Sequence, residues 1–159
     1  ARALRAARIR SAILNFGGQV LALGPDAEDH WVVPVAHPSR RGEEVLRLHL
    51  RGRSASTSSQ SERSLTAGGR RVGHILDPRN GEPVPPWGSV TVVAEDPAVA
   101  DMLSTALLVL GPEAGARWAE RRSDVGVLFL VERDGRVLPR WNQALKAFFV
   151  SETTVSRRR

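Results

Sequence analysis

The stretch that most constrains the fold is a strand followed by a helix whose two ends are both marked in the sequence. Ser89–Ala94 reads as a strand, because small and β-branched residues run through it without a charge (SVTVVA). Asp96-Pro97 then combines a helix-capping carboxylate with a proline suited to the first turn, and Gly111-Pro112 ends the helix. The order predicts a strand that leads directly into a helix packed on a sheet.

The helix between these signals carries an isolated polar pair. The stripe predicted to face inward is apolar at helical spacing and is formed by Val99, Leu103, Ala106, Leu107 and Leu110. Asp101 and Thr105 are four residues apart and are therefore neighbours on the other side. A carboxylate among apolar neighbours is costly unless it is paired. Asp101 is thus either a ligand of a hard cation such as magnesium or a partly exposed residue without a role.

The rest of the chain is predicted to form short strands joined by turns. Further strands are expected at residues 11–16, 19–23, 31–35, 45–50, 71–76 and 125–131. A second helix is expected at 113–122, residues 1–10 resemble the last turns of a helix, and 141–149 fits either a strand or a helix. Strands in hairpins together with packed helices predict an α+β fold with antiparallel sheets.

Two segments allow a structural and a functional interpretation. Gly17-Gly18 lies between two predicted strands, which is typical of a tight hairpin turn, although glycines also allow a ligand to approach the backbone closely. Arg53–Arg63 (RSASTSSQSER) has few bulky side chains and many hydroxyls. Such a run is more often a flexible loop than a binding site, although hydroxyls and free amides also line phosphate pockets.

Composition limits the classes of function. A chain of 159 residues with 42% hydrophobic content is long enough for one domain with a core. The absence of cysteine excludes disulfides, thiolate metal sites and a cysteine nucleophile. No apolar run is long enough to span a bilayer, and no signal peptide is evident. Residues 151–159 are predicted to be a polar basic tail.

The net charge of +6 permits an anionic partner, so a non-enzymatic basic domain that binds nucleic acid or a protein is one hypothesis. The arginines are scattered, however, and the chain has no tyrosine, four phenylalanines and four tryptophans. Without basic residues interleaved with aromatic ones, and without a nucleic-acid-binding motif, nucleic acid is not expected as a partner.

The segment before the strand and helix carries a recognisable motif. A short predicted strand leads His74 into a turn rich in Asp, Pro, Asn and Gly, and the run from His74 to Pro83 reads HILDPRNGEP. This run resembles the H-I-I/L-D-P-x-T/N-G-x-P signature of the ApbE family, the FAD:protein FMN transferases. Residues 100–107 (ADMLSTAL) are similar to the family's A-D-A-L-A-T-A-L, and residues 14–20 (LNFGGQV) resemble its N-x-G-G-D/N-V element.

The resemblance implies a fold and an activity. Members have a T-fold-related α+β core, bind FAD with magnesium, split its pyrophosphate and transfer FMN to a threonine of a target flavoprotein. By position, Asp101 and Thr105 correspond to magnesium ligands. His74 corresponds to the catalytic centre and to the FAD site, and Ile75 to an FAD contact. Independently of the family, His74 also fits a structural role in capping the turn with a hydrogen bond.

The sequence departs from the family pattern in two ways. The family's loop before the signature usually reads A-T-S-G-D-Y/S, whereas in this chain Thr57-Ser58-Ser59-Gln60-Ser61 replaces the glycine and the acid. Members are also about twice as long, so residues 1–150 are expected to be the carboxy-terminal part of the transferase domain, with an amino-terminal half missing. That half normally carries a glycine- and lysine-containing segment that contacts FAD and gives the metal a backbone oxygen. Members are often exported or lipid-anchored.

These departures leave a second hypothesis within the same chemistry. A relative that binds FAD, or hydrolyses it with water in place of the acceptor threonine, needs the same metal ligands but no protein acceptor. Flavin transfer is the leading hypothesis because ordered matches to the family extend over most of the chain.

Overall fold

The fold is built on one six-stranded antiparallel sheet. In this computed structural model, residues 2–24, 30–40, 42–61, 64–67 and 70–149 are described. The strand order is β1-β2-β5-β8-β9-β10. These strands are β1 (Ala12–Phe16), β2 (Gln19–Leu23), β5 (Ser54–Ser59), β8 (Gly88–Ala94), β9 (Gly126–Arg133) and β10 (Arg136–Trp141). The α+β class and the antiparallel pairing predicted from the sequence are confirmed.

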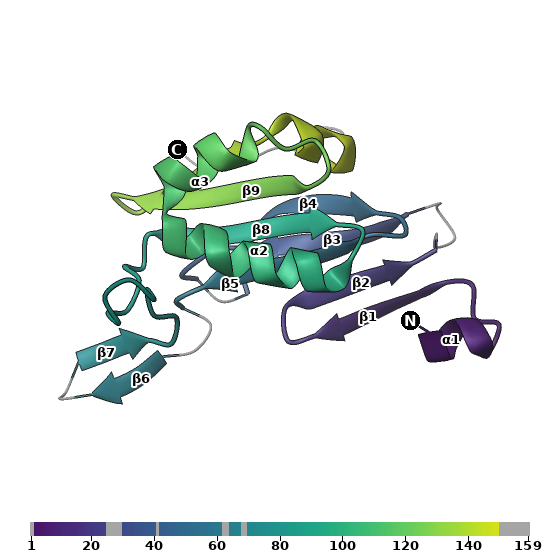
Figure 1. Cartoon of the computed structure of the whole chain (residues 1–159), viewed down its shortest axis with the longest axis horizontal. Coiled ribbons are helices and arrows are strands. Elements are labelled where there is room, and N and C mark those ends of the chain that lie inside the picture. The colour runs from purple at the N-terminus through teal and green to yellow at the C-terminus, as the bar shows by residue number, and fades with distance from the viewer. Residues whose placement is uncertain (1, 25–29, 41, 62–63, 68–69, 150–159) are drawn as a thin grey trace.

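The sheet separates two layers (Figure 1). Helices α2 (Pro97–Leu110) and α3 (Pro112–Ala119) pack on one face, over β8 and β9. The other face packs against the two-stranded sheet of β3 (Trp31–Ala36) and β4 (Glu44–Leu50) and against the 3-10 helix Gln143–Phe148. A small hairpin of β6 (Ser64–Ala67) and β7 (Arg70–Gly73) projects from the body, and α1 (Arg2–Ala6) precedes β1.

Successive side chains of the central strands point to opposite faces of the sheet, so each face has its own hydrophobic core. In β8, Val90 and Val92 pack with the helices, whereas Val93 faces the other core. In β9, Phe129 packs with the helices, and Leu128 belongs to the opposite core. A strand covered on both faces has no place for charged residues, which is why Gly88–Ala94 and the first six residues of β9 carry no charge in the sequence.

Strand β5 overturns the prediction of a flexible loop at residues 53–63. Five of its six residues are buried, although its sequence is SASTSS. Ser54–Ser59 pairs along its whole length with β8, and Ser54–Ser56 also pairs with β2. The strand lies inside the sheet, so its backbone is satisfied by its neighbours, and its small hydroxyl side chains are buried where they find hydrogen-bond partners.

Helix α2 begins and ends where the sequence predicts. The Asp96 carboxylate accepts a hydrogen bond from the Ala98 N–H at 2.8 Å, Pro97 occupies the first turn, and Gly111 ends the helix with φ of 83°. The predicted inward stripe is only partly correct. The fully buried residues are Ala100, Ser104, Leu107 and Leu108.

Ala106 and Leu110, which were predicted to be buried, are exposed. The helix is rotated about its axis relative to the predicted stripe, because the small Ser104 side chain faces the hydroxyls of β5 and lets the two elements approach closely. The orientation of α2 therefore depends on a polar contact that an apolar pattern cannot reveal.

The remaining elements largely follow the predictions. The predicted strand at 71–76 ends earlier, as β7 ends at Gly73, and Leu76 forms only an isolated bridge with Pro83. The undecided segment 141–149 ends β10 at Trp141 and continues as the 3-10 helix, capped by the Asn142 side chain. The predicted tail at 151–159 lies outside the described residues. Within the described ranges, no helix is long and apolar enough to cross a membrane.

Candidate functional site

The signature segment forms a compact turn. The N–H of Asp77 donates to the carbonyl of Glu82 at 2.7 Å, and the N–H of Gly81 donates to the carbonyl of Asp77 at 2.8 Å. Gly81 has φ of 75°, a backbone conformation that favours glycine. The Arg79 side chain forms an ion pair with Asp77 and, by hydrogen bonding to it, lowers the pKa of the Asp77 carboxyl to about 2.

His74 and Ile75 lie between β7 and this turn. Ile75 is partly buried and packs against the core between α2 and the sheet. His74 is exposed, so its imidazole is accessible from solvent. The segment after the turn also contacts α2, because the indole N–H of Trp87 donates to the carbonyl of Leu108 at 3.2 Å. The signature is thus attached to the carboxy-terminal half of the helix that carries Asp101 and Thr105.

A network of hydroxyl groups links α2 to β5. The Ser56 hydroxyl donates to Oδ1 of Asp101 at 3.0 Å. The Ser58 hydroxyl lies 2.8 Å from that of Ser104 and 3.0 Å from that of Thr105. Ser104, which is fully buried, also donates to the carbonyl of Asp101 at 2.9 Å. The side chains of the two predicted metal ligands are therefore each hydrogen-bonded by a residue of β5, Ser56 for Asp101 and Ser58 for Thr105.

The position of Asp101 corrects the argument from burial. The sequence suggested a carboxylate surrounded by apolar residues, but both Asp101 and Thr105 are exposed, as is Met102 between them. Because Asp101 is exposed, burial by itself does not require that a cation pair with it. What distinguishes the pair is the supporting network, since it presents a carboxylate and a hydroxyl oxygen at adjacent positions on one exposed helix turn.

The Asn-x-Gly-Gly segment forms the hairpin turn between β1 and β2. Phe16 pairs with Gln19, Gly17 and Gly18 have φ of 63° and 100°, and the Asn15 side chain accepts a hydrogen bond from the Gly18 N–H at 3.2 Å. The structural interpretation of the two glycines is confirmed. The Gln19 side chain donates to the carbonyl of Pro97 at 2.6 Å, which fixes this hairpin beside the start of α2.

The segment that departs from the family pattern is well packed. Ser59 is buried, and both its hydroxyl and that of Ser61 donate to the carbonyl of Pro38. The Gln60 side chain is buried and hydrogen-bonds the backbone of Ile75, next to His74. The sequence analysis gave the hydroxyls of residues 53–63 only as a less favoured binding alternative, and it did not predict the contacts of Ser56, Ser58 and Gln60 with the site. Their spacing at every second residue is the signal that could have revealed them, because alternate residues of a strand share a face.

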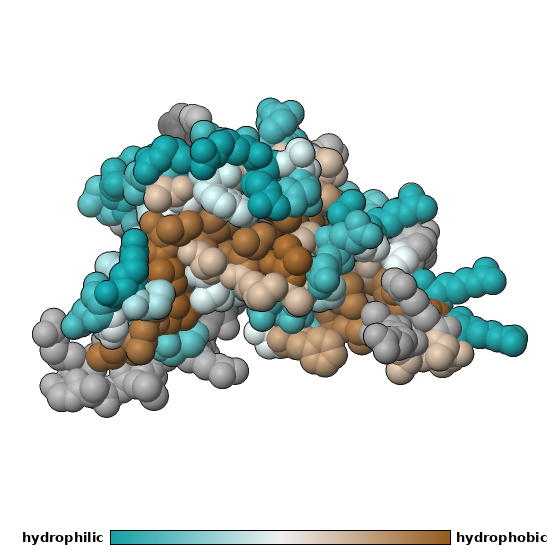
Figure 2. Space-filling view, in the orientation of Figure 1, coloured by the Kyte–Doolittle hydropathy of each residue, from teal (hydrophilic) through white to brown (hydrophobic). Residues whose placement is uncertain are grey.

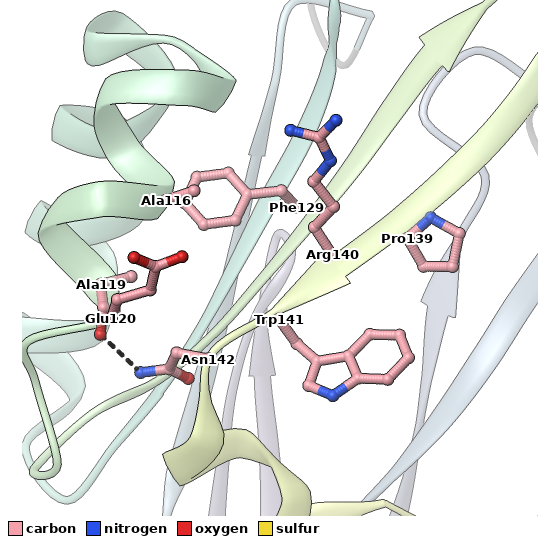
Figure 3. A pocket seen from close by; sticks show the side chains of 8 residues that line it. All are labelled: Ala116, Ala119, Glu120, Phe129, Pro139, Arg140, Trp141 and Asn142. Atoms are coloured by element: carbon pink, nitrogen blue, oxygen red, sulfur yellow. Dashed lines mark hydrogen bonds between the residues drawn. The ribbon is translucent and has the colours of Figure 1, made fainter.

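Other features of the molecule lie away from these residues. An open hollow of about 360 Å³ is bounded by α3, β9 and β10 (Figure 3). Its wall includes Phe129 and Trp141, and the Asn142 side chain at its edge donates to the carbonyl of Ala119 at 3.1 Å. Within the described part of the chain, no group of three or more His, Cys, Asp or Glu side chains could hold a metal ion.

A protein-family comparison matches residues 1–129 to the ApbE family. A Rhodobacter capsulatus protein named FAD:protein FMN transferase is 38% identical over 135 residues, which cover 84% of this chain and 25% of that protein. A Klebsiella pneumoniae protein of the same name is 32% identical over 137 residues, which cover 85% of this chain and 42% of that protein.

Solved structures give the same result. The ApbE protein of Thermotoga maritima matches 89% of this chain with a TM-score of 0.74 and 30% identity, and 45% of that structure is covered. The Pseudomonas stutzeri flavinyl transferase ApbE in its apo form matches 96% with a TM-score of 0.75 and 30% identity, and 48% of it is covered. The chain thus spans less than half the length of the relatives it matches.

Proposed function

Because this chain belongs to the ApbE family, we propose that it forms part of a magnesium-dependent flavin transferase that uses FAD to attach FMN to a threonine of a target flavoprotein. Residues 1–150 are its carboxy-terminal part in this proposal. The observation that carries the proposal is the network by which Ser56 and Ser58 of β5 support the side chains of Asp101 and Thr105.

The oxygen atoms on this helix turn suit a hard cation. Magnesium prefers oxygen ligands and is often held by one or two protein carboxylates together with substrate phosphates. Asp101 would supply a carboxylate oxygen and Thr105 a hydroxyl oxygen. Since Oδ1 of Asp101 already accepts from Ser56, the orientation of the carboxylate is set before any ligand binds. When bound, magnesium would neutralise negative charge on the pyrophosphate of FAD.

The transfer breaks the phosphoanhydride bond of FAD and makes a phosphoester bond to the acceptor. The hydroxyl oxygen of the acceptor threonine forms a bond to the phosphorus of the FMN half of FAD. The bond from that phosphorus to the bridging pyrophosphate oxygen breaks, and AMP leaves with this oxygen. His74, which is exposed at the end of β7, would accept the proton of the threonine hydroxyl. Ile75 would contact the flavin nucleotide beside it.

In this proposal the site is completed by the part of the relatives that this chain does not cover. Large apolar side chains are exposed near the predicted ligands, with Met102 on α2 at 63% exposure and Phe16 at the end of β1 at 70%. Figure 2 shows an apolar surface along α2, in contrast to the hydrophilic surface over α3. Exposed apolar surface of this kind is typical of an interaction site, and in this proposal the upstream half covers it. We therefore expect the 159-residue chain alone to bind FAD weakly and to transfer FMN slowly.

The experiment compares this chain with and without the matching upstream half of a family member, added in cis or as a separate chain. Each sample is incubated with FAD, magnesium and an acceptor carrying the threonine motif, and labelling is read as in-gel flavin fluorescence. We expect labelling only when the upstream half is present. Release of FMN and AMP without labelling would identify a hydrolase instead, and robust labelling by the isolated chain would show that the site is complete within these residues.

Asp101→Asn tests the metal site. The substitution keeps the side-chain volume and removes the negative charge, so isothermal titration should show a magnesium affinity at least about tenfold lower. Asp96→Asn is the matched control, because asparagine also caps helices and Asp96 acts at the helix end, outside the proposed ligand set. Equal magnesium affinity of Asp101→Asn and the unmodified chain would refute the assignment.

A further inference from the structure

The side chain of Gln60 forms hydrogen bonds with the backbone of the signature segment, as a neighbouring strand would. Gln60 directly follows β5 and is 4% exposed. Its amide nitrogen donates to the carbonyl of Ile75 at 2.6 Å and to the carbonyl of Val84 at 2.8 Å. Its amide oxygen accepts from the N–H of Ile75 at 3.1 Å. Both backbone groups of Ile75 are therefore paired with one side chain, as they would be with a neighbouring strand.

Gly73 shows how closely this side chain fits. A Cβ atom at position 73 would lie 2.1 Å from the Gln60 amide oxygen and 2.4 Å from its amide carbon. The amide cannot move away without losing its hydrogen bonds to Ile75 and Val84. Gly73 lies on one side of His74, and Ile75 lies on the other. The Gln60 amide thus contacts the residues on both sides of His74.

The same strand carries the other contacts of the site. Ser56 reaches Asp101, Ser58 reaches Thr105, and Gln60 reaches Ile75. These residues occur at every second position, so they extend to the same side of the chain in and just beyond β5. One short segment, Ser56–Gln60, therefore contacts both the helix side chains with the proposed ligand oxygens and the backbone next to His74.

We propose that Gln60 is a positioning residue of the flavin-transfer site, which holds Ile75 and thereby the His74 imidazole in a fixed place relative to Asp101 and Thr105. This inference rests on the proposed function for the role of His74. Group transfer depends on the placement of reacting groups, so a backbone shift of about 1 Å at His74 is expected to reduce the transfer rate on the order of a hundredfold. Gln60 itself is assigned no contact with substrate.

Gln60→Met is the first test variant. Methionine fills a similar space with an unbranched, adaptable side chain but can neither donate to the two carbonyls nor accept from the Ile75 N–H. Magnetic resonance of the 159-residue chain without flavin reports the result directly. We expect the His74 ring signals to shift, and the Ile75 amide to exchange with solvent at least about tenfold faster, because its buried partner is lost.

Gly73→Ala, the second test variant, perturbs the contact between residue 73 and the Gln60 amide. Its Cβ should displace the Gln60 amide and shift the His74 signals in the same way. In a Gln60→Ala background the added methyl group no longer meets an amide, so Gly73→Ala should then cause little further change. Such non-additivity is expected only when the two residues act through one contact. This variant also keeps the test decisive if Gln60→Met fails to fold.

Ser59→Ala is the matched control. Ser59 precedes Gln60 and is equally buried, but its hydroxyl donates to the carbonyl of Pro38 on the other side of the strand. It should leave the His74 and Ile75 signals in place. The proposal is overturned if folded Gln60→Met, or Gly73→Ala, leaves both the His74 signals and the Ile75 exchange rate unchanged. Since neither measurement contains flavin, this outcome is distinguishable from a failure of the transfer assay.

Discussion

The signature segment at residues 74–83 and strand β5 both provide polar groups for the candidate site, but they are held in opposite ways. The signature turn is held by bonds between near neighbours, such as Arg79 with Asp77 and Asp77 with Glu82. The hydroxyls of Ser56 and Ser58 in β5 lie at buried positions and bond residues that are 45 to 47 positions away in the sequence. The turn can be recognised in the sequence because its interactions are local, whereas the role of β5 becomes evident only from its contacts with α2.

This difference also predicts how each region responds to substitution. The ion pair of the turn is open to water on its Arg79 side, which is 66% exposed against 15% for Asp77, and a pair that water and salt screen adds little stability. A buried hydroxyl that loses its partner keeps its desolvation cost. Changes in the signature should therefore alter chemistry with little effect on stability, and changes in β5 or its partners should alter both.

The largest effect is expected from His74→Ala in the signature. If His74 accepts the proton of the acceptor threonine, the rate of flavin transfer should fall by about 100- to 10,000-fold, while FAD binding stays within severalfold. The assay requires an active, complete form of the protein, and the unfolding midpoint should change little. Glu82→Gln, a neutral change elsewhere in the exposed turn, is the control. An unchanged transfer rate in His74→Ala would exclude the catalytic role.

Ser56→Ala tests whether β5 orients the proposed metal ligand. The substitution removes the hydroxyl that donates to Asp101, which leaves the carboxylate free to turn. Loss of a partner that orients a metal ligand typically reduces affinity about 10- to 100-fold, so titration with magnesium and FAD should show a weakening in this range. Ser54→Ala, whose hydroxyl donates to the Val20 carbonyl on the same strand, controls for strand stability. Equal affinity in the two variants would remove Ser56 from the site.

Ser104→Ala separates stability from ligand binding. Ser104 is fully buried and lies between Ser58 and the Asp101 carbonyl, so its removal should lower the free energy of unfolding by about 1–3 kcal/mol. Denaturant unfolding measures the change. Ser123→Ala, at an exposed position after α3, should have no measurable effect. Equal stability of the two variants would contradict the view that the β5–α2 network stabilises the fold.

The smallest effect is expected at the ion pair of the signature turn. Arg79→Gln should raise the pKa of Asp77 from about 2 toward its ordinary value of about 3.9, because the hydrogen bonds from Arg79 are what lower it. Asp77 favours the folded state above its unfolded pKa, and this contribution disappears as the pH falls through about 2. Carboxyl titration by magnetic resonance measures the shift. Asp124, whose pKa is also about 2 because of Arg122, should not change.

The elements that depend on interactions between near neighbours could be predicted from the sequence. The cap and the end of α2, the two-residue hairpin at Gly17-Gly18 and the strands β8 and β9 were all predictable, because capping, backbone conformation and two-sided burial act within a few residues. The signature motif also identified the family. The positions of Asp101, Thr105 and His74 within the site were predicted, and their chemical roles remain proposals.

The other features depend on contacts between segments that are far apart in the sequence. A run of serines is equally compatible with a loop and with a buried strand, and β5 is a strand because β2 and β8 pair with it on both sides. The rotation of α2 followed from the contact of Ser104 with Ser58, and the placement of His74 followed from the bonds of Gln60 to Ile75. Each of these contacts joins residues that are distant in sequence. They therefore stabilise the structure only once folding has brought the segments together.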